Sequence, residues 1–153
     1  MSNCLKIKAL VCFAVSVGYV PKMHVPYRYK AWFFFNIFTP LSIFLTKYVK
    51  SKPFGFMENL NARVVRDWRA WCREPDYFFS KKYYGKTVPI GYFQNLPFPI
   101  HVYWASDDPL SNSQTIPMFW QHIKSSERID FQELTPINYA QKEIGHFGFF
   151  KKT

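Results

Sequence analysis

The chain is poor in the residues that build metal sites and disulfide frameworks. Its 153 residues include 3 cysteines, Cys4, Cys12 and Cys72, and no Cys-x-x-Cys or Cys-x-x-His pair occurs. Zinc sites usually need such closely spaced pairs, and disulfide frameworks need an even number of cysteines. The sequence therefore predicts neither a metal site nor structural disulfides. It indicates a reducing compartment, and we expect a cytoplasmic protein.

Long apolar runs are also missing. The longest stretch without a charge, Ala31 to Thr46, has 16 residues and contains Pro40. A membrane-spanning helix needs about 20 mostly apolar residues, and a proline kinks the interior of a helix. A bilayer-spanning segment is therefore not expected. Residues 9–18 have the outline of a signal peptide, but no small-residue cleavage site follows, so a buried β-strand is the favoured interpretation.

Acidic residues are scarce, whereas basic and aromatic residues are abundant. The chain has 20 Lys plus Arg against 10 Asp plus Glu, a formal net charge of +10, and 21% aromatic residues. This balance is typical of proteins that bind nucleic acid or anionic membranes. No nucleic-acid-binding motif is recognised, so we predict no nucleic acid partner. The 48% of hydrophobic residues suffices for the core of one domain.

The first two thirds of the chain read as one strand followed by aromatic-rich helices. We predict a strand at 7–17, two helical pieces split by Pro40 within 27–50, an amphipathic helix at 58–73 and an irregular aromatic segment at 76–98. In the helix at 58–73 the apolar positions with helical spacing are Leu60, Val64, Trp68 and Trp71. The arginines of the same helix are expected on a solvated face: Arg63, Arg66, Arg69 and Arg73.

The last third of the chain has the alternating pattern of a parallel α/β sheet. A strand at 99–104, a helix at 113–124 and a strand at 128–134 are followed by a glycine-flanked histidine, His146. The apolar face of the helix consists of Ile116, Phe119, Trp120 and Ile123.

Asp108 and His146 follow consecutive strands of this predicted sheet. Sites of open α/β sheets lie beyond the carboxyl ends of the strands, so both side chains are expected at the same edge. A carboxylate there can fix the tautomer of an imidazole and stabilise the imidazolium that forms during proton transfer. The pair is therefore our candidate for an acid and a base.

These same segments resemble a known family. Trp104-Ala-Ser-Asp-Asp-Pro-Leu110 and Ile144-Gly-His-Phe-Gly-Phe-Phe150 are similar to the C-terminal part of an α/β-hydrolase. The similarity is greatest to an uncharacterised bacterial group of predicted serine hydrolases. The segment from Asn59 to Tyr77 resembles the lid helix of that group, and Gly18-Tyr19 resembles the end of the strand that leads into the lid.

The resemblance implies a partial α/β-hydrolase fold and a function. Asp108 is then the acid and His146 the base of a catalytic triad, with Asp107 as the alternative acid. The complete enzyme is expected to hydrolyse an ester or a similar small acyl substrate without metal or organic cofactor. Trp68 and Trp71 are expected either to line the substrate pocket or to pack the lid. The oligomeric state is left open.

No nucleophile elbow of the type Gly-x-Ser-x-Gly is present. The nearest approach is Ala14-Val-Ser-Val-Gly18, and we reject Ser16 because β-branched residues flank it and fit a strained turn poorly. We therefore expect a single hydrolase domain, 1–153, truncated at both ends and inactive alone. Its parts are a strand leading into the lid (1–26), the helical lid (27–98) and the C-terminal strands (99–153).

A second hypothesis does not involve catalysis. The aromatic residues of 27–50 are flanked by cations at both ends, and the helix at 58–73 is rich in arginine. A small basic protein with these features is expected to make peripheral contact with anionic membrane surfaces.

Overall fold

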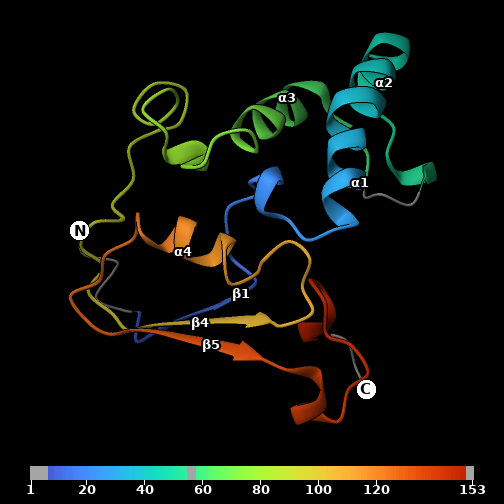
Figure 1. Ribbon diagram of the computed structural model, residues 1–153. Helices are drawn as coiled ribbons and strands as arrows, with labels where there is room; N and C mark the ends of the chain where they lie inside the picture. The colour runs from blue at the N-terminus through green and yellow to red at the C-terminus, as the bar shows by residue number, and fades with distance from the viewer. Residues whose placement is uncertain (1–6, 55–57, 151–153) are drawn as a thin grey trace.

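A three-stranded parallel sheet forms the centre of the structure, a computed structural model that describes residues 7–54 and 58–150 (Figure 1). Its strands are β1 Leu10–Phe13, β4 Ile100–Ala105 and β5 Ile129–Leu134, in that spatial order. Both neighbouring pairs are parallel, as is usual for strands joined by long crossover connections. The fold is therefore α/β in general, as the sequence predicts.

The first strand is shorter than its predicted span of 7–17. Phe13 is the last residue paired with β4, and the next residue, Ala14, has a φ of 53°. A positive φ is uncommon for alanine and ends the extended conformation. The hydroxyl of Ser111 donates a 2.6 Å hydrogen bond to the carbonyl oxygen of Ala14, so the loop after β4 holds the chain where it leaves the sheet.

Helix α4, Thr115–Trp120, covers one face of the sheet (Figure 1). It is shorter than the predicted span of 113–124, but Ile123 still reaches the core. The core between α4 and the sheet consists of Phe98, Ile100, Val102, Ile116, Trp120 and Ile123. Nε1 of Trp120 donates to the carbonyl oxygen of Val15 at 3.0 Å, which satisfies the indole N–H inside this core.

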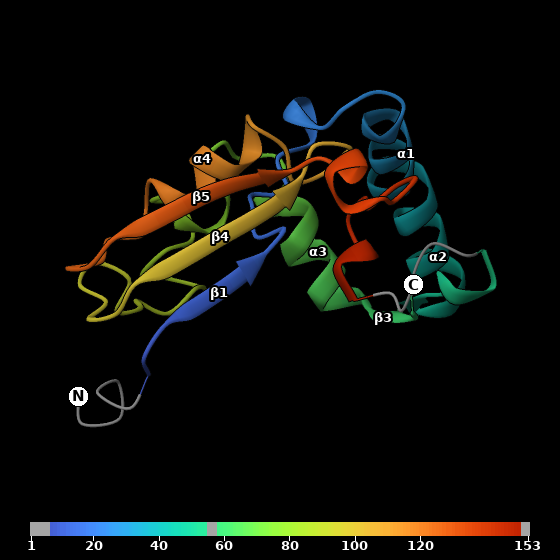
Figure 2. The same ribbon diagram turned by 90° about the horizontal axis from the view of Figure 1, so that it is seen from below.

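No α-helix of the described residues covers the opposite face of the sheet, which Figure 2 shows towards the viewer. Phe13 stacks on Tyr103 with a centroid distance of 5.5 Å, and Phe149 and Phe150 also contact its ring. β1 lies at one edge of the sheet, and within the described segments no strand pairs with its outer side. Val11 at this edge is 51% exposed.

A long helix follows β1 and its loop. It consists of α1 Tyr27–Phe33, a π-helical turn Phe34–Phe38 and α2 Thr39–Thr46. The prediction that Pro40 splits this segment into two pieces is wrong in detail, because the helix continues through a wider turn just before the proline. Pro40 has no N–H to donate to the carbonyl group four residues earlier, and a π-helical turn is one way for a helix to adjust.

Helix α3, Ala62–Trp71, crosses this long helix (Figure 1). The side chain of Asn61 accepts a 2.8 Å hydrogen bond from the N–H of Arg63, a cap that stabilises a helix by about 1 kcal/mol. The helix begins later than predicted because Leu60–Asn61 form a strand, β3, antiparallel to β2 Tyr48–Val49.

The buried face of α3 differs from the predicted one. Val65 and Cys72 are buried, whereas Val64 is 56% exposed. Val65, Trp68 and Cys72 are three and four residues apart, so they also satisfy helical spacing. The registers with Val64 or Val65 facing inward are equally periodic, and packing against Phe34 and Phe35 selects the second.

The aromatic segment 76–98 is irregular, as predicted, with one short 3-10 helix at Tyr77–Phe79. Phe79 contacts Phe93 and Phe119 edge-on and stacks on His122 at 4.4 Å. These contacts attach the segment 76–98 to α4, and through α4 to the sheet, by aromatic packing.

Candidate active site

Asp108 and His146 meet at the carboxyl ends of β4 and β5. Asp108 lies in the turn after β4, is fully buried, and its Oδ2 is 2.8 Å from Nδ1 of His146. A carboxylate can only accept at this distance, so Nδ1 carries the hydrogen. The structure thus brings together the two residues that the sequence proposes as acid and base, while their catalytic role stays a prediction.

The carboxylate of Asp108 is held by further hydrogen bonds. Its Oδ1 accepts from the backbone N–H of Leu110 at 2.8 Å and from that of Ser111 at 3.0 Å. A buried carboxylate needs such donors, because an unpaired charge in the interior is very costly. With three donors around two oxygens, the orientation of the carboxylate towards His146 is fixed.

Asp107, the alternative acid, has a different partner. Its two carboxylate oxygens each accept a 3.0 Å hydrogen bond, from the backbone N–H groups of Ile144 and Gly145. Gly145 has a φ of 58°, a conformation that glycine adopts without strain. Asp107 therefore holds the loop that carries His146, and Asp108 binds the imidazole itself.

The second imidazole nitrogen of His146 is available. The His146 side chain is 26% exposed, and among the described residues no group forms a hydrogen bond with Nε2. With the hydrogen on Nδ1, Nε2 presents a lone pair that can accept a proton. This is the tautomer that a general base of the serine-hydrolase type requires.

Among the described residues, the Ser16 hydroxyl forms no hydrogen bond with His146. Its Oγ lies 2.8 Å from Oγ of Ser111, whose own hydrogen bonds to the carbonyl oxygen of Ala14. Ser111 is then the acceptor in the serine pair. The expectation that Ser16 is not the nucleophile stays a prediction.

The two tryptophans of α3, Trp68 and Trp71, pack against other aromatic residues. Trp68 lies edge-on to Phe35 with a centroid distance of 4.9 Å, and Trp71 contacts Tyr77 and Phe78 edge-on. Neither lines the cavity that the structure contains in this region. Which of the two expected roles they have, packing or substrate binding, stays a prediction.

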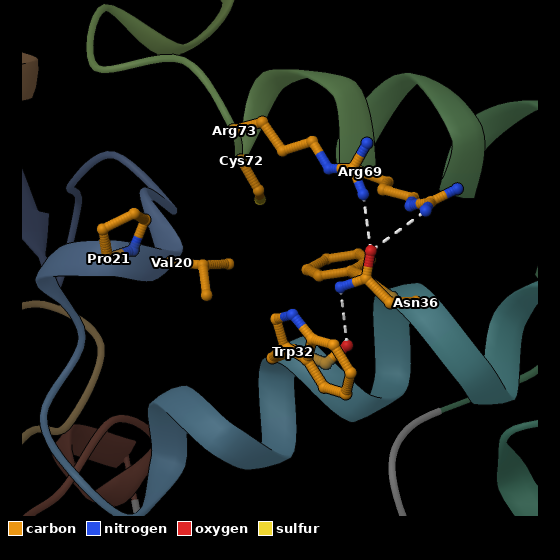
Figure 3. Close-up of a pocket in the computed structure, with 8 residues that line it drawn as sticks. Val20, Pro21, Trp32, Asn36, Arg69, Cys72 and Arg73 are labelled. Carbon is orange, nitrogen blue, oxygen red and sulfur yellow. Dashed lines mark hydrogen bonds between the residues drawn. The ribbon is translucent and has the colours of Figure 1, made fainter.

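A cavity of about 200 Å³ lies between α3 and the long helix. Figure 3 shows Asn36, Arg69 and Arg73 converging at one side of this cavity. The sequence analysis missed this cavity and placed Arg69 on a solvated face, whereas Nε of Arg69 is buried. One signal in the sequence could have indicated this cavity. Arg69 and Arg73 are one helical turn apart, and no acidic residue lies within one turn of both of them.

Cys72 also lines this cavity, as a thiol. Burial raises its pKa to about 12, although the hydrogen bond with Tyr77 opposes this shift. Burial raises the pKa of the Tyr77 hydroxyl as well. Both groups therefore stay protonated near neutral pH, and Cys72 behaves as a small apolar residue in the packing of α3.

The remaining histidines have local partners or lie on the surface. Nδ1 of His101 is 3.5 Å from Asp130, Nε2 of His122 is 3.4 Å from Asp76, and His24 is exposed. Within residues 7–54 and 58–150, no three His, Cys, Asp or Glu side chains are placed to hold a metal ion.

No family model, no curated protein and no solved structure matches this chain. In the part of the chain that the structure describes, none of the helices has the length and apolar character needed to cross a bilayer. The geometry of Asp108 and His146 is accordingly the main guide to function.

Proposed function

We propose that this chain carries the acid and the base of a serine-type α/β-hydrolase that cleaves esters or similar acyl bonds. One observation carries the proposal: a fully buried carboxylate, Asp108, is bound to Nδ1 of His146, while Nε2 is left without a partner among the described residues. A histidine oriented in this way is suited to take a proton from a hydroxyl nucleophile.

The proposed reaction uses only proton transfers and acyl transfer. The hydroxyl oxygen of the nucleophile attacks the acyl carbon while its proton moves to Nε2 of His146. Asp108 stabilises the imidazolium that results, and His146 then gives the proton to the leaving-group oxygen. A water molecule repeats both steps on the acyl intermediate and releases the acid. No metal or organic cofactor is part of this scheme.

The topology supports the same proposal. The acid follows the middle strand of the sheet and the base follows the neighbouring strand, β5, so both lie at the carboxyl edge. We propose that the helical insertion between β1 and β4 is the lid that the sequence resemblance implies.

Hydrolysis of para-nitrophenyl acetate tests the base directly, because water can replace the hydroxyl nucleophile. We expect His146→Ala and Asp108→Asn each to lower the rate by about tenfold or more. His122→Ala is the matched control, since His122 also interacts with an aspartate but lies away from Asp108. Equal rates in His146→Ala and His122→Ala would contradict the proposal. Loss of all turnover in Ser16→Ala would show that Ser16 is the nucleophile after all.

The second candidate function, contact with an anionic membrane surface, is favoured by one observation. The long helix exposes large apolar side chains along one side: Phe33, Ile37, Leu41, Phe44 and Leu45. Phe44 is 85% exposed. Lysines flank this apolar surface, so it combines the two features that draw a helix to anionic lipids.

Vesicle sedimentation distinguishes this candidate from the first. We expect the chain to bind phosphatidylserine vesicles at low salt and to be released by high salt. Phe44→Ser is expected to weaken binding, and Tyr92→Ser is the control because Tyr92 is 87% exposed outside the long helix. No binding at low salt, or equal weakening in both variants, rejects the membrane role without affecting the hydrolase proposal.

A further inference from the structure

Two arginines at the C-terminal end of α3 donate hydrogen bonds to a single amide oxygen. Arg69 donates from Nη2 to Oδ1 of Asn36 at 3.0 Å, and Arg73 donates to the same oxygen (Figure 3). Asn36 belongs to the π-helical turn, and its Nδ2 donates to the carbonyl oxygen of Trp32 at 2.8 Å. This last bond fixes the amide so that its oxygen faces the arginines.

The two guanidinium groups carry more positive charge than their surroundings balance. Neither Arg69 nor Arg73 takes part in the ion pairs formed between described residues. Burial, and secondly the charge of Arg73, lower the pKa of the Arg69 guanidinium. Nε of Arg69 is buried without a hydrogen-bond partner in the structure, and a buried unpaired donor is costly.

Most of the remaining cavity wall is apolar. Val20 and Pro21 line it from the segment after β1, and Trp32 and Phe35 line it from the long helix. The volume of about 200 Å³ exceeds the roughly 150 Å³ of an engineered protein cavity that binds benzene. The cavity therefore has room for a small apolar body next to the arginines.

We propose that this cavity binds a small organic carboxylate. The carboxylate would bridge Arg69 and Arg73, and its apolar body would contact Trp32, Phe35 and Val20. Planar guanidinium groups match the two oxygens of a carboxylate, and the negative charge balances the two arginines that form no ion pair between described residues. A phosphate is a weaker fit, because a second negative charge would be desolvated against apolar walls. The site does not depend on the catalytic role of His146.

Calorimetric titration with hexanoate, hexan-1-ol and hexyl phosphate separates the contributions of charge and apolar body. We expect hexanoate to bind more tightly than the alcohol of equal chain length by about tenfold or more. The Nε–H resonance of Arg69 in a nitrogen-15 NMR spectrum should shift on addition of hexanoate. Equal affinity for hexanoate and hexan-1-ol, or no binding of either, overturns the proposal. Tighter binding of hexyl phosphate overturns the assignment to carboxylates.

Variants locate the binding to this cavity. Arg69→Met is expected to weaken hexanoate binding about tenfold and to leave hexan-1-ol binding nearly unchanged. Arg66→Met is the matched control, because Arg66 is exposed on the same helix. Arg69→Lys keeps the charge but not the planar fork, so it should also weaken binding if Arg69→Met fails to fold. An unchanged affinity in Arg69→Lys, or equal losses in the Arg66 and Arg69 variants, contradicts the site.

Discussion

Oδ2 of Asp108 lies 2.8 Å from Nδ1 of His146, although 38 positions separate the two residues in the chain. The contact is possible because β4 and β5 are adjacent and parallel, so the turns that follow them meet at one edge of the sheet. Asp108 also accepts two backbone hydrogen bonds, which leaves its second oxygen for the imidazole. The tautomer of His146 is thus set by the carboxylate.

We expect Asp108→Asn to reverse the tautomer of His146. The amide oxygen can still accept from the N–H groups of Leu110 and Ser111, so the amide NH2 then faces Nδ1 and donates to it. The hydrogen of the neutral imidazole must move to Nε2, which nitrogen-15 NMR distinguishes. Asp107→Asn is the control, because Asp107 does not contact the imidazole. The same tautomer in Asp108→Asn and in the unaltered chain would contradict this reading.

Asp107→Ala should loosen the loop that carries His146. The backbone N–H groups of Ile144 and Gly145 lose the acceptor that they have among the described residues, at a cost of about 1–3 kcal/mol. Hydrogen exchange at these two amides is expected to become faster, while exchange in β4 changes little. Asp67→Ala, at an exposed position of α3, serves as the control. Unchanged exchange at Ile144 and Gly145 would show that the carboxylate does not hold the loop.

Gly18→Ala should destabilise the protein. A Cβ at Gly18 would lie 2.9 Å from Sγ of Cys72, closer than packed atoms tolerate. We expect the free energy of unfolding in urea to fall by about 1–3 kcal/mol. Gly148→Ala is the matched control, because its Cβ would lie 3.5 Å from Ile144, an ordinary contact. The added cost of Gly18→Ala should shrink in a Cys72→Ala background, and equal costs in both backgrounds would exclude this clash.

Stability should fall in alkaline solution, in part because of Cys72. Its thiol ionises near its usual pKa of 9.0 in the unfolded chain but only near pH 12 in the folded protein, because burial disfavours the thiolate. Above pH 9.0 the unfolded chain therefore binds fewer protons than the folded one, and the free energy of unfolding decreases as the pH rises. Urea titrations across this range measure the slope, to which Tyr77 also contributes. The free energy of unfolding of Cys72→Ala should decrease less steeply with pH than that of the unaltered chain. An equal slope would show that the Cys72 thiol does not contribute to the pH dependence.

The elements that could be predicted from the sequence are those with strong local patterns. The strands at 99–104 and 128–134 and the apolar face of α4 lie where β-branched residues and helical spacing place them. The register of α3 was not predictable in the same way, since Val64 and Val65 fit the periodicity equally. The effect of Pro40 was missed because a π-helical turn leaves no local signal in the sequence.

The residues of the candidate site were also predictable from the sequence only in part. The sequence proposed Asp108 and His146 from their places after consecutive strands, but it could not assign separate partners to Asp107 and Asp108. Adjacent aspartates are chemically identical, and the three-dimensional course of the loop decides which backbone or imidazole group each one reaches. The arginine cavity was missed because Asn36 and Arg69 are brought together only by the packing of α3 across the long helix.

By itself, the sequence determined the α/β alternation, the aromatic-rich insertion and the residue types that can transfer a proton. Local propensity and periodicity suffice for these features, because they act over a few neighbouring residues. Only the tertiary structure decided which side chains meet: Asp108 with His146, and Arg69 and Arg73 with Asn36. Such contacts join distant segments, and their geometry depends on how whole elements pack rather than on any local stretch of the chain.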